Sequence, residues 1–226
     1  IVSYLNSIPF LYGLEHSTSL KNRIEISKDI PSKTAAKLKN KEVDLGLVPV
    51  AILPQLSDYQ IVSDYCIGAN GAVKSVVLLS EVPLNKIEKI YLDYHSRTSV
   101  NLCKVLCKHY WKIDVEFIDA LEGFEEKIGG TAAGVVIGDR TFHLNDKFTF
   151  RFDLAEEWHH WKNLPFVFAA WVSNHPLDKS FINAFNNALE EGLVKKELAI
   201  ENYPVLNIEK KDKVEYLNKY IDYHLD

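Results

Sequence analysis

The sequence contains no methionine and only three cysteines among its 226 residues. Cys66, Cys103 and Cys107 are an odd number and have no spacing typical of metal ligands, so they predict neither a disulfide framework nor a zinc site. We expect Cys103 and Cys107 to extend the apolar face of a helix. This cysteine usage favours a reducing cytoplasm. Because position 1 is not methionine, we expect the sequence to begin downstream of the initiator, which leaves a removed signal peptide open.

Long hydrophobic runs and an excess of positive charge are also missing. The longest apolar run, from Leu164 to Val172, is far shorter than the ~20 residues that cross a bilayer. The 26 basic and 31 acidic residues give a formal net charge of -5, the wrong sign for a general binder of nucleic acid or anionic membranes. The sequence therefore predicts neither a membrane nor a nucleic-acid partner, and an anionic ligand must be bound by local donors.

Several motifs with a defined chemistry are absent. No GxSxG, GxGxxG or GxxxxGKS pattern occurs, which removes support for a serine hydrolase, a dinucleotide-binding protein or a P-loop protein. His159 and His160 follow Glu156 and Glu157, but the HExxH spacing of zinc enzymes does not occur. We therefore expect no metal site.

The remaining pattern predicts a globular protein of the α/β class. Hydrophobic residues make up 47% and charged residues 25%, and the length suits one large domain or two small ones. Apolar β-branched runs alternate with segments of helical period, which is typical of βα units around mainly parallel sheets. The predicted strands span residues 1–5, 23–27, 44–50, 60–67, 73–80, 89–94, 115–118, 134–138, 148–153 and 166–173. The predicted helices span residues 32–41, 98–111, 121–128, 154–161, 178–192 and 211–224.

Two prolines break this alternation and suggest where the chain crosses between lobes. Pro83 follows the strand of residues 73–80, and Pro165 precedes the most apolar strand. The predicted division is residues 1–82 with 166–226 in lobe 1 and residues 83–165 in lobe 2, joined by two crossing strands with a central cleft. Small-ligand sites form preferentially at such interfaces. The alternative is one continuous doubly wound sheet.

Two polar segments follow predicted strands and precede helices. Asn6 could donate to a ligand oxygen while Ser7 caps the first helix. The second segment begins the helix of residues 98–111 and could bind a carboxylate or a phosphate through a guanidinium and hydroxyl donors. Its residues are Ser96, Arg97, Thr98 and Ser99. Ordinary helix capping is the alternative for both segments.

Two further residues lie beside strand ends. Ser75 follows Asn70-Gly71, a turn signal that favours a simple hairpin, and it would lie near the first proposed crossing. Asp139 follows the buried strand that ends at Gly138 and could act as an acid, a metal ligand or a helix cap. Capping is the favoured interpretation of Asp139.

Six motifs taken together resemble one known family, the chorismate dehydratases of the futalosine route to menaquinone. They are VSYLNSIPFLYGL from Val2, DLGLVPVAIL from Asp44, IVSDYCIGANGAVKSVVLLSEVPL from Ile61, DYHSRTSVNL from Asp93, IGD from Ile137 and DLAEEWHHWKNLPFVFAAWV from Asp153. The similarity covers most of the first 172 residues in the right order. It implies a two-lobed fold like that of type II periplasmic binding proteins, with two α/β lobes closing on a ligand.

The resemblance also implies a reaction, namely loss of water from chorismate to give 3-[(1-carboxyvinyl)oxy]benzoate. Such a protein is a hydro-lyase, a carbon-oxygen lyase of the cytoplasm that acts on a small molecule and needs no cofactor. Two alternatives stay open. One is a non-catalytic solute-binding protein for a small carboxylate, because the same scaffold serves capture without chemistry. The other is the related naphthoate-forming enzyme of the same pathway.

The motif match assigns roles to individual residues. It implies that Asn6 and Ser75 contact the reacting ring or its departing hydroxyl, with Asp139 as a third catalytic candidate. The substrate-binding candidates are Ser96, Arg97, Thr98 and Ser99. The proton acceptor stays open among Asp139, His95 and the substrate's own enolpyruvyl carboxylate.

Overall fold

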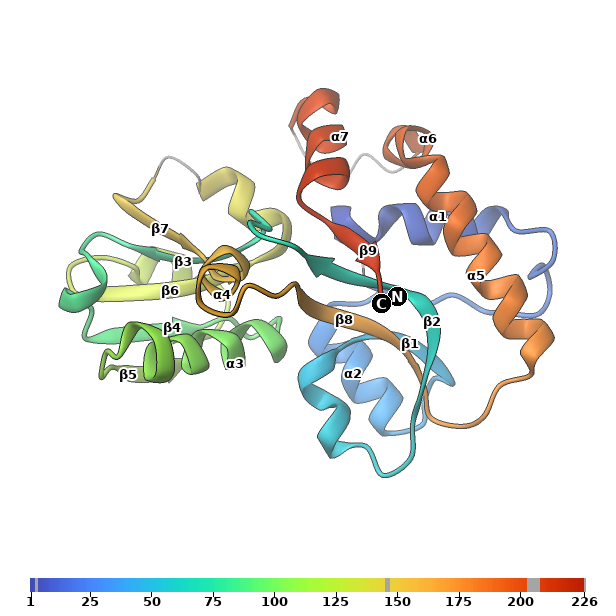
Figure 1. Ribbon diagram of the computed structural model, residues 1–226, viewed down its shortest axis with the longest axis horizontal. Helices are drawn as coiled ribbons and strands as arrows, with labels where there is room; N and C mark the ends of the chain where they lie inside the picture. Colours follow the sequence, from blue (N-terminus) through green and yellow to red (C-terminus); the bar gives the residue numbers. More distant parts are fainter. Residues whose placement is uncertain (3, 145–146, 203–207, 226) are drawn as a thin grey trace. The chain divides into compact units, whose positions relative to one another are not determined.

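The chain folds into two α/β units, each built around its own sheet. Figure 1 shows the computed structural model, which describes residues 1–2, 4–144, 147–202 and 208–225. Unit 1 comprises Ile1–Gly68 and Val167–Asp226, and unit 2 comprises Ala69–Phe166. The chain leaves unit 1 at the end of β2 (Gln60–Ala69) and returns at the start of β8 (Phe166–Ser173). The α/β class is therefore confirmed, and each unit is described by itself.

Unit 1 contains a four-stranded sheet with the order β1-β8-β2-β9. β1 (Leu45–Pro49) pairs antiparallel with β8, and β9 (Asp222–His224) pairs antiparallel with β2. Its α-helices are α1 (Ile8–His16), α2 (Pro31–Lys39), α5 (Lys179–Val194), α6 (Lys196–Asn202) and α7 (Lys210–Lys219). Its short 3-10 helices are η1 (Leu5–Ser7) and η2 (Val50–Gln55). Apolar side chains of α2, β1, η2 and β8 form one buried core cluster beside this sheet.

Helices α1 and α5 approach each other unusually closely, as the neighbouring ribbons in Figure 1 illustrate. A Cβ atom added to Gly13 of α1 would lie 1.9 Å from the carbonyl oxygen of Ala188. A Cβ atom added to Gly192 of α5 would lie 1.9 Å from the carbonyl oxygen of Pro9. Because both neighbours are backbone atoms, only glycine fits at the two positions. The two glycines thus fix the spacing between α1 and α5.

Unit 2 contains a five-stranded sheet with the order β5-β4-β6-β3-β7. The strands are β3 (Val76–Ser80), β4 (Lys89–Leu92), β5 (Glu116–Asp119), β6 (Ala132–Ile137) and β7 (Phe150–Asp153). Strand β4 runs parallel to β5 and β6, whereas β3 runs antiparallel to β6 and β7. The helices are α3 (Thr98–Val105), its π-helical continuation η4 (Leu106–Trp111) and α4 (Leu154–Lys162), with short 3-10 turns η3 (Leu84–Lys86), η5 (Phe124–Lys127) and η6 (Gly138–Leu144).

The structure corrects the expected pairing of strands. The sheets are not mainly parallel, since β1, β3 and β9 each pair antiparallel with their neighbours, and the sheet of unit 2 is mixed. The segment around Asn70-Gly71 is not a hairpin, because β2 and β3 belong to different sheets. The predicted division at residue 82 also differs from the observed one at residue 69, because both neighbours of β3 lie in unit 2.

Four predicted elements take a different form. Residues 23–27 are not assigned as a strand, although the Ile1 amino group donates a hydrogen bond to the carbonyl oxygen of Ser27. Of the predicted first strand, Val2 forms a single parallel bridge with Asp29, and residue 3 lies outside the described residues. The predicted helix of residues 121–128 is reduced to η5. The predicted helix of residues 211–224 ends at Lys219 in α7, and β9 follows because it pairs with β2.

Candidate functional site

Three polar segments of unit 2 meet at one edge of its sheet. Strands β4 and β6 are parallel, so their carboxyl ends lie at the same edge, and the antiparallel strand β3 begins there. Residues 93–99 follow β4, residues 138–140 follow β6, and Ser75 precedes β3. The backbone N–H of Gly138 donates to the carbonyl oxygen of Ser75 at 2.8 Å. Carboxyl ends of parallel strands are where ligands bind in open α/β sheets.

The backbone before Ser75 is fixed by a buried carboxylate. One oxygen of Asp153 accepts hydrogen bonds from the N–H groups of Val73 at 3.0 Å and Lys74 at 2.6 Å. Its other oxygen caps α4 by accepting from Ala155 and Glu156. Burial raises the pKa of Asp153, and these four N–H donors act in the opposite direction. Ser75 itself is only 2% exposed, so it occupies a defined position at this edge.

The segment at the start of α3 combines capping with exposed charge. The Ser96 hydroxyl accepts from the backbone N–H of Ser99 at 3.0 Å and donates to the Ser99 hydroxyl at 3.0 Å. This is the geometry of a helix N-cap, one residue before the N-cap position assigned to Arg97. Ser96, Thr98 and Ser99 are buried, whereas Arg97 is exposed. Capping therefore accounts for the position of the Ser96 side chain.

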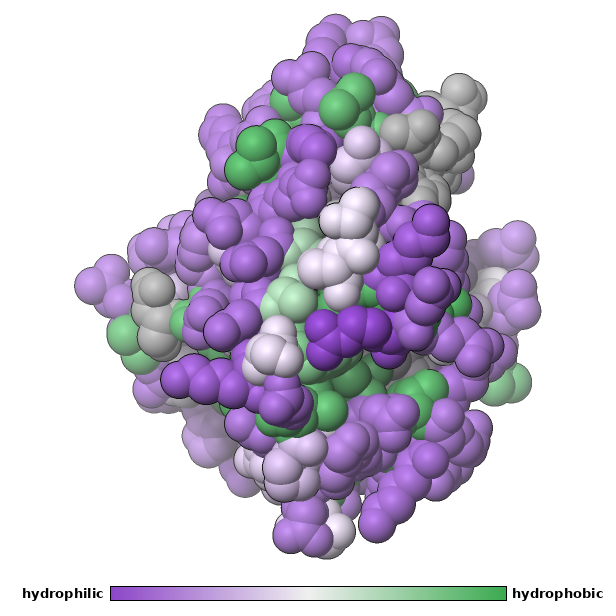
Figure 2. All heavy atoms as spheres, turned by 90° about the vertical axis from the view of Figure 1, so that its right-hand side faces the viewer, coloured by the Kyte–Doolittle hydropathy of each residue, from purple (hydrophilic) through white to green (hydrophobic). Residues whose placement is uncertain are grey.

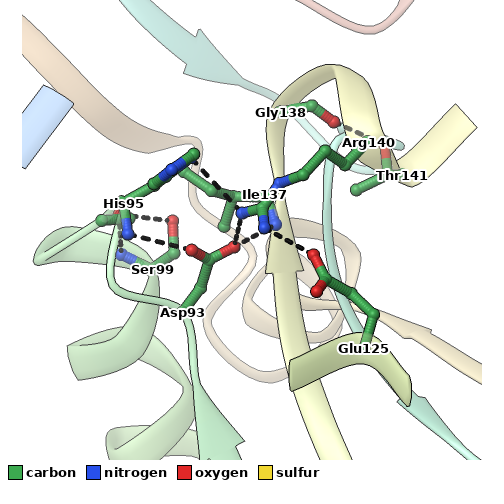
Figure 3. A network of polar contacts seen from close by, with 9 residues as sticks. Asp93, His95, Ser99, Glu125, Ile137, Gly138, Arg140 and Thr141 are labelled. Atoms are coloured by element: carbon green, nitrogen blue, oxygen red, sulfur yellow. Dashed lines mark hydrogen bonds and ion pairs between the residues drawn. The ribbon is translucent and has the colours of Figure 1, made fainter. Parts of the chain in front are cut away.

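A buried carboxylate, Asp93, connects the ends of β4 and β6 (Figure 3). One of its oxygens accepts from the backbone N–H of Ile137 at 3.0 Å and forms an ion pair with Arg140. Its other oxygen accepts from the backbone N–H of His95 at 2.9 Å. The side chain of Asp93 is fully buried. Asp93 therefore fixes both loops that carry predicted site residues.

Arg140 is matched in charge by two carboxylates. Its guanidinium pairs with Asp93 and with Glu125 of η5, as the dashed lines in Figure 3 show. The guanidinium carbon also lies 5.7 Å from the ring centre of Tyr94 and 5.9 Å from that of Phe124. The sequence interpretation assigned no role to Arg140 or Glu125. An Asp and an Arg that follow neighbouring parallel strands were the available signal for this network.

His95 lies beside this network and is half-buried. Its Nδ1 atom is 3.4 Å from Nη2 of Arg140. Burial lowers the pKa of His95, and the nearby Arg140 acts in the same direction, whereas Asp93 opposes the shift. The imidazole is therefore neutral near pH 7, which is the form that can accept a proton.

The lowered pKa of His95 predicts a pH-dependent stability that a His95→Asn variant lacks. Below the ordinary histidine pKa of 6.5, the unfolded chain binds a proton before the folded protein does. The free energy of unfolding should therefore fall as the pH drops from about 7.5 through 6.5 towards the folded pKa. Urea unfolding of both proteins across this range measures the difference. Parallel pH profiles for wild type and His95→Asn would contradict this description of His95.

The remaining two predicted residues lie in different units. Asp139 is buried in the first turn of η6, beside Gly138. Asn6 lies in η1 of unit 1 and is half-buried, and the following Ser7 donates its hydroxyl to the carbonyl oxygens of Val2 at 2.7 Å and Tyr4 at 2.9 Å. The structure thus brings Ser75, residues 96–99 and Asp139 to one edge of unit 2, whereas Asn6 is placed by the elements of unit 1.

Unit 1 contains a cavity of about 600 Å³ that none of the predicted site residues lines. Its wall includes the first residue, Ile1, together with residues 23–27 and 42–45. Figure 2 shows a face of the molecule that is mostly hydrophilic, with hydrophobic side chains visible in a furrow near its middle.

Within the described ranges, no three His, Cys, Asp or Glu side chains are grouped as metal ligands would be, and no helix is long and apolar enough to cross a bilayer.

Comparison with known proteins places the chain in a family. All residues from 1 to 226 match the family model described as menaquinone biosynthesis. This chain belongs to that family. A related protein from Thermus thermophilus, named chorismate dehydratase, is 27% identical over 184 residues, which cover 73% of this chain and 67% of that protein. The resemblance seen in the sequence motifs is thereby confirmed at the level of the family.

Solved structures confirm the predicted fold. A protein of Archaeoglobus fulgidus matches with a TM-score of 0.72 at 14% identity, over 98% of this chain and 86% of its own. An ABC transporter protein of Parabacteroides distasonis matches with a TM-score of 0.64 at 16% identity, over 98% and 84%. A TRAP periplasmic solute-binding protein of Haemophilus influenzae, solved with L-gulonate, matches with a TM-score of 0.52 at 13% identity, over 96% and 83%. At these identities the likeness shows the two-lobed solute-binding-protein fold alone.

Proposed function

We propose that this member of the menaquinone biosynthesis family is a cytoplasmic hydro-lyase of the futalosine route that removes water from chorismate, giving 3-[(1-carboxyvinyl)oxy]benzoate. The observation that carries the proposal is the gathering of Ser75, residues 96–99 and Asp139 at one sheet edge. The similarity to the chorismate dehydratase of Thermus thermophilus supports the choice of substrate.

The chemistry suits a site made of positioned hydrogen-bond donors. Loss of the ring C3 hydrogen and the C4 hydroxyl makes the ring aromatic, so the overall change consumes no oxidant or reductant. The protein must orient chorismate, stabilise the departing hydroxyl and assist proton transfer. Positioning of this kind lowers barriers by roughly 7 to 11 kcal/mol in the best intramolecular cases.

One substrate carboxylate is assigned to the start of α3. Arg97 is exposed there, and the backbone N–H groups and hydroxyls of the first turn lie beside it. The helix dipole favours an anion at this end. Arg140, by contrast, already pairs with Asp93 and Glu125, so its charge is used within the protein. Asn6 and Ser75 are assigned to the reacting ring and its departing hydroxyl.

The proton acceptor is assigned to the enolpyruvyl carboxylate of the substrate, which the protein holds in place. His95 and Asp139 are the protein groups that compete for this role, and His95 is neutral and able to accept a proton near pH 7. Single-turnover aromatisation by His95→Asn and Asp139→Asn decides between them. A loss above about a thousandfold in either variant, equal to about 4 kcal/mol, would transfer the role of base to that residue.

The proposal as a whole is tested by mixing the purified protein with chorismate and following the ultraviolet absorbance of the ring. We expect the absorbance to change catalytically, over many turnovers per protein molecule. Binding without consumption would instead favour a solute-binding protein for a small carboxylate. The Haemophilus influenzae structure of similar fold is of a TRAP periplasmic solute-binding protein with bound L-gulonate. Consumption of a larger nucleoside-derived substrate in place of chorismate would favour the naphthoate-forming enzyme of the pathway.

A further inference from the structure

A tyrosine near the carboxyl end contacts the backbone of Asn6. The hydroxyl of Tyr223 donates to the carbonyl oxygen of Asn6 at 2.8 Å, although the two residues are 217 positions apart in the sequence. Tyr223 is 4% exposed, so water does not replace this bond readily. Asn6 lies in η1, a single short turn between Tyr4 and α1. The bond is therefore a long-range restraint on a three-residue turn.

The ring of Tyr223 is fixed by its neighbours. It packs edge-to-face against Phe10 of α1, with ring centres 5.2 Å apart. Nζ of Lys196 lies 5.1 Å from the Tyr223 ring centre and donates to the side-chain oxygen of Asn218 at 3.2 Å. Burial raises the pKa of Tyr223 well above its ordinary value. The phenol therefore keeps its proton and remains a donor to Asn6 at neutral pH.

The backbone around Tyr223 is anchored as well. Strand β9 pairs antiparallel with β2, with His224 opposite Tyr65 and Asp222 opposite Gly68. The N–H of Leu225 donates to the carbonyl oxygen of Asp64 at 2.9 Å. Tyr223 is thus a side chain with a fixed ring and a fixed backbone, whose one polar atom is directed at Asn6.

We propose that Tyr223 is a positioning residue, which holds the main chain of Asn6 so that the Asn6 amide meets the reacting ring of the substrate. This inference rests on the proposed function. The Tyr223 hydroxyl contacts the main-chain carbonyl oxygen of Asn6. Tyr223 can therefore act on Asn6 without touching the substrate. The substrate carboxylate is assigned to the start of α3, which Tyr223 of β9 does not form. Loss of the Tyr223 hydroxyl should therefore slow the chemical step and leave the affinity for the substrate unchanged.

The first test is kinetic. Tyr223→Phe removes the hydroxyl and keeps the ring, and we expect kcat for chorismate to fall at least about tenfold while KM stays within about twofold. Placing para-aminophenylalanine at position 223 returns a weaker donor at nearly the same place, and kcat should then lie between those of the other two proteins. This second variant also serves if Tyr223→Phe does not fold. A kcat equal to wild type in Tyr223→Phe, or a change confined to KM, would overturn the proposal.

Tyr65→Phe is the matched control. Tyr65 lies on β2 in the same sheet, and its ring centre is 6.3 Å from that of Phe10, so both tyrosines pack against the same phenylalanine. The hydroxyl of Tyr65 does not make the bond to Asn6, which comes from Tyr223. We expect kcat of Tyr65→Phe to stay within about twofold of wild type. An equal loss in both variants would assign the effect to general packing and overturn the proposal.

A second readout does not depend on turnover. The peptide N–H of Ser7 follows the Asn6 carbonyl directly, so loss of the Tyr223 bond should shift the amide resonance of Ser7 in an NMR spectrum. We expect this shift in Tyr223→Phe and not in Tyr65→Phe. If wild type does not consume chorismate, the proposed function fails, and the Ser7 resonance alone judges whether Tyr223 restrains Asn6. An unmoved Ser7 resonance in Tyr223→Phe would overturn the proposal in either case.

Discussion

Replacing Ser75 by alanine is expected to slow the single-turnover dehydration of chorismate by about 100-fold to 1,000-fold, the usual loss when one preorganised donor to a developing charge is removed. Asn6→Ala should have an effect of the same size. Ser75 is 2% exposed, and the two residues before it, Val73 and Lys74, donate their N–H groups to the Asp153 carboxylate. The position of Ser75 is therefore set before the substrate binds. Rapid quenching with product quantification measures the rate, and circular dichroism confirms that the variants are folded.

Ser80→Ala is the matched control for Ser75→Ala. Ser80 is also buried and lies at the other end of β3, where its hydroxyl donates to the carbonyl oxygen of Val82 at 2.8 Å. Its removal costs two hydrogen bonds, one to the carbonyl oxygen and one from the N–H group of Val82, about 2 kcal/mol of stability, and should leave the rate of dehydration unchanged. If the Asn6 and Ser75 variants both turn over chorismate at near wild-type rates, the assignment of the site is wrong.

Gly13→Ala is expected to lower the free energy of unfolding by about 3 kcal/mol, at the upper end of the cost of overpacking. The added methyl group would lie 1.9 Å from the carbonyl oxygen of Ala188, and a backbone atom cannot turn aside as a side chain can. Helices α1 and α5 must therefore separate. Urea unfolding curves give the change in stability directly.

Gly129→Ala provides the comparison for Gly13→Ala. No atom lies within 4 Å of a Cβ atom built on Gly129, so the substitution should change stability by no more than about 0.5 kcal/mol. Because η1 leads straight into α1, Gly13→Ala should also disturb Asn6 and reduce activity in the fraction that stays folded. Equal stability of Gly13→Ala and wild type would show that α1 and α5 do not pack as described.

Local pattern predicted where elements lie much better than which elements pair. The predicted strand of residues 60–67 corresponds to β2, and the predicted helix of residues 154–161 corresponds to α4. The spacing of apolar residues along the chain locates helices and strands, because it shows which residues face a core. That spacing could not show that β3 pairs antiparallel with β6 and β7, because strand pairing depends on contacts between residues far apart in the sequence.

The candidate site was predictable to a similar extent. The polar residues of the β4–α3 junction are visible in the sequence because they interrupt an apolar pattern at a helix start. The pairing of Asp93 with Arg140 and Glu125 was not visible, because it depends on β4 and β6 being neighbours in the sheet. Tyr223 was missed for a related reason. It was expected within a helix, whereas pairing of β9 with β2 places it beside Asn6.

The identity of the compound formed from chorismate decides whether this protein is a dehydratase. Stoichiometric amounts of protein and chorismate are incubated, and the product is analysed by mass spectrometry and proton NMR. We expect a product lighter than chorismate by one water, with an aromatic ring that keeps its enolpyruvyl ether. Recovery of unchanged chorismate, or of a rearranged isomer of the same mass, would contradict this expectation.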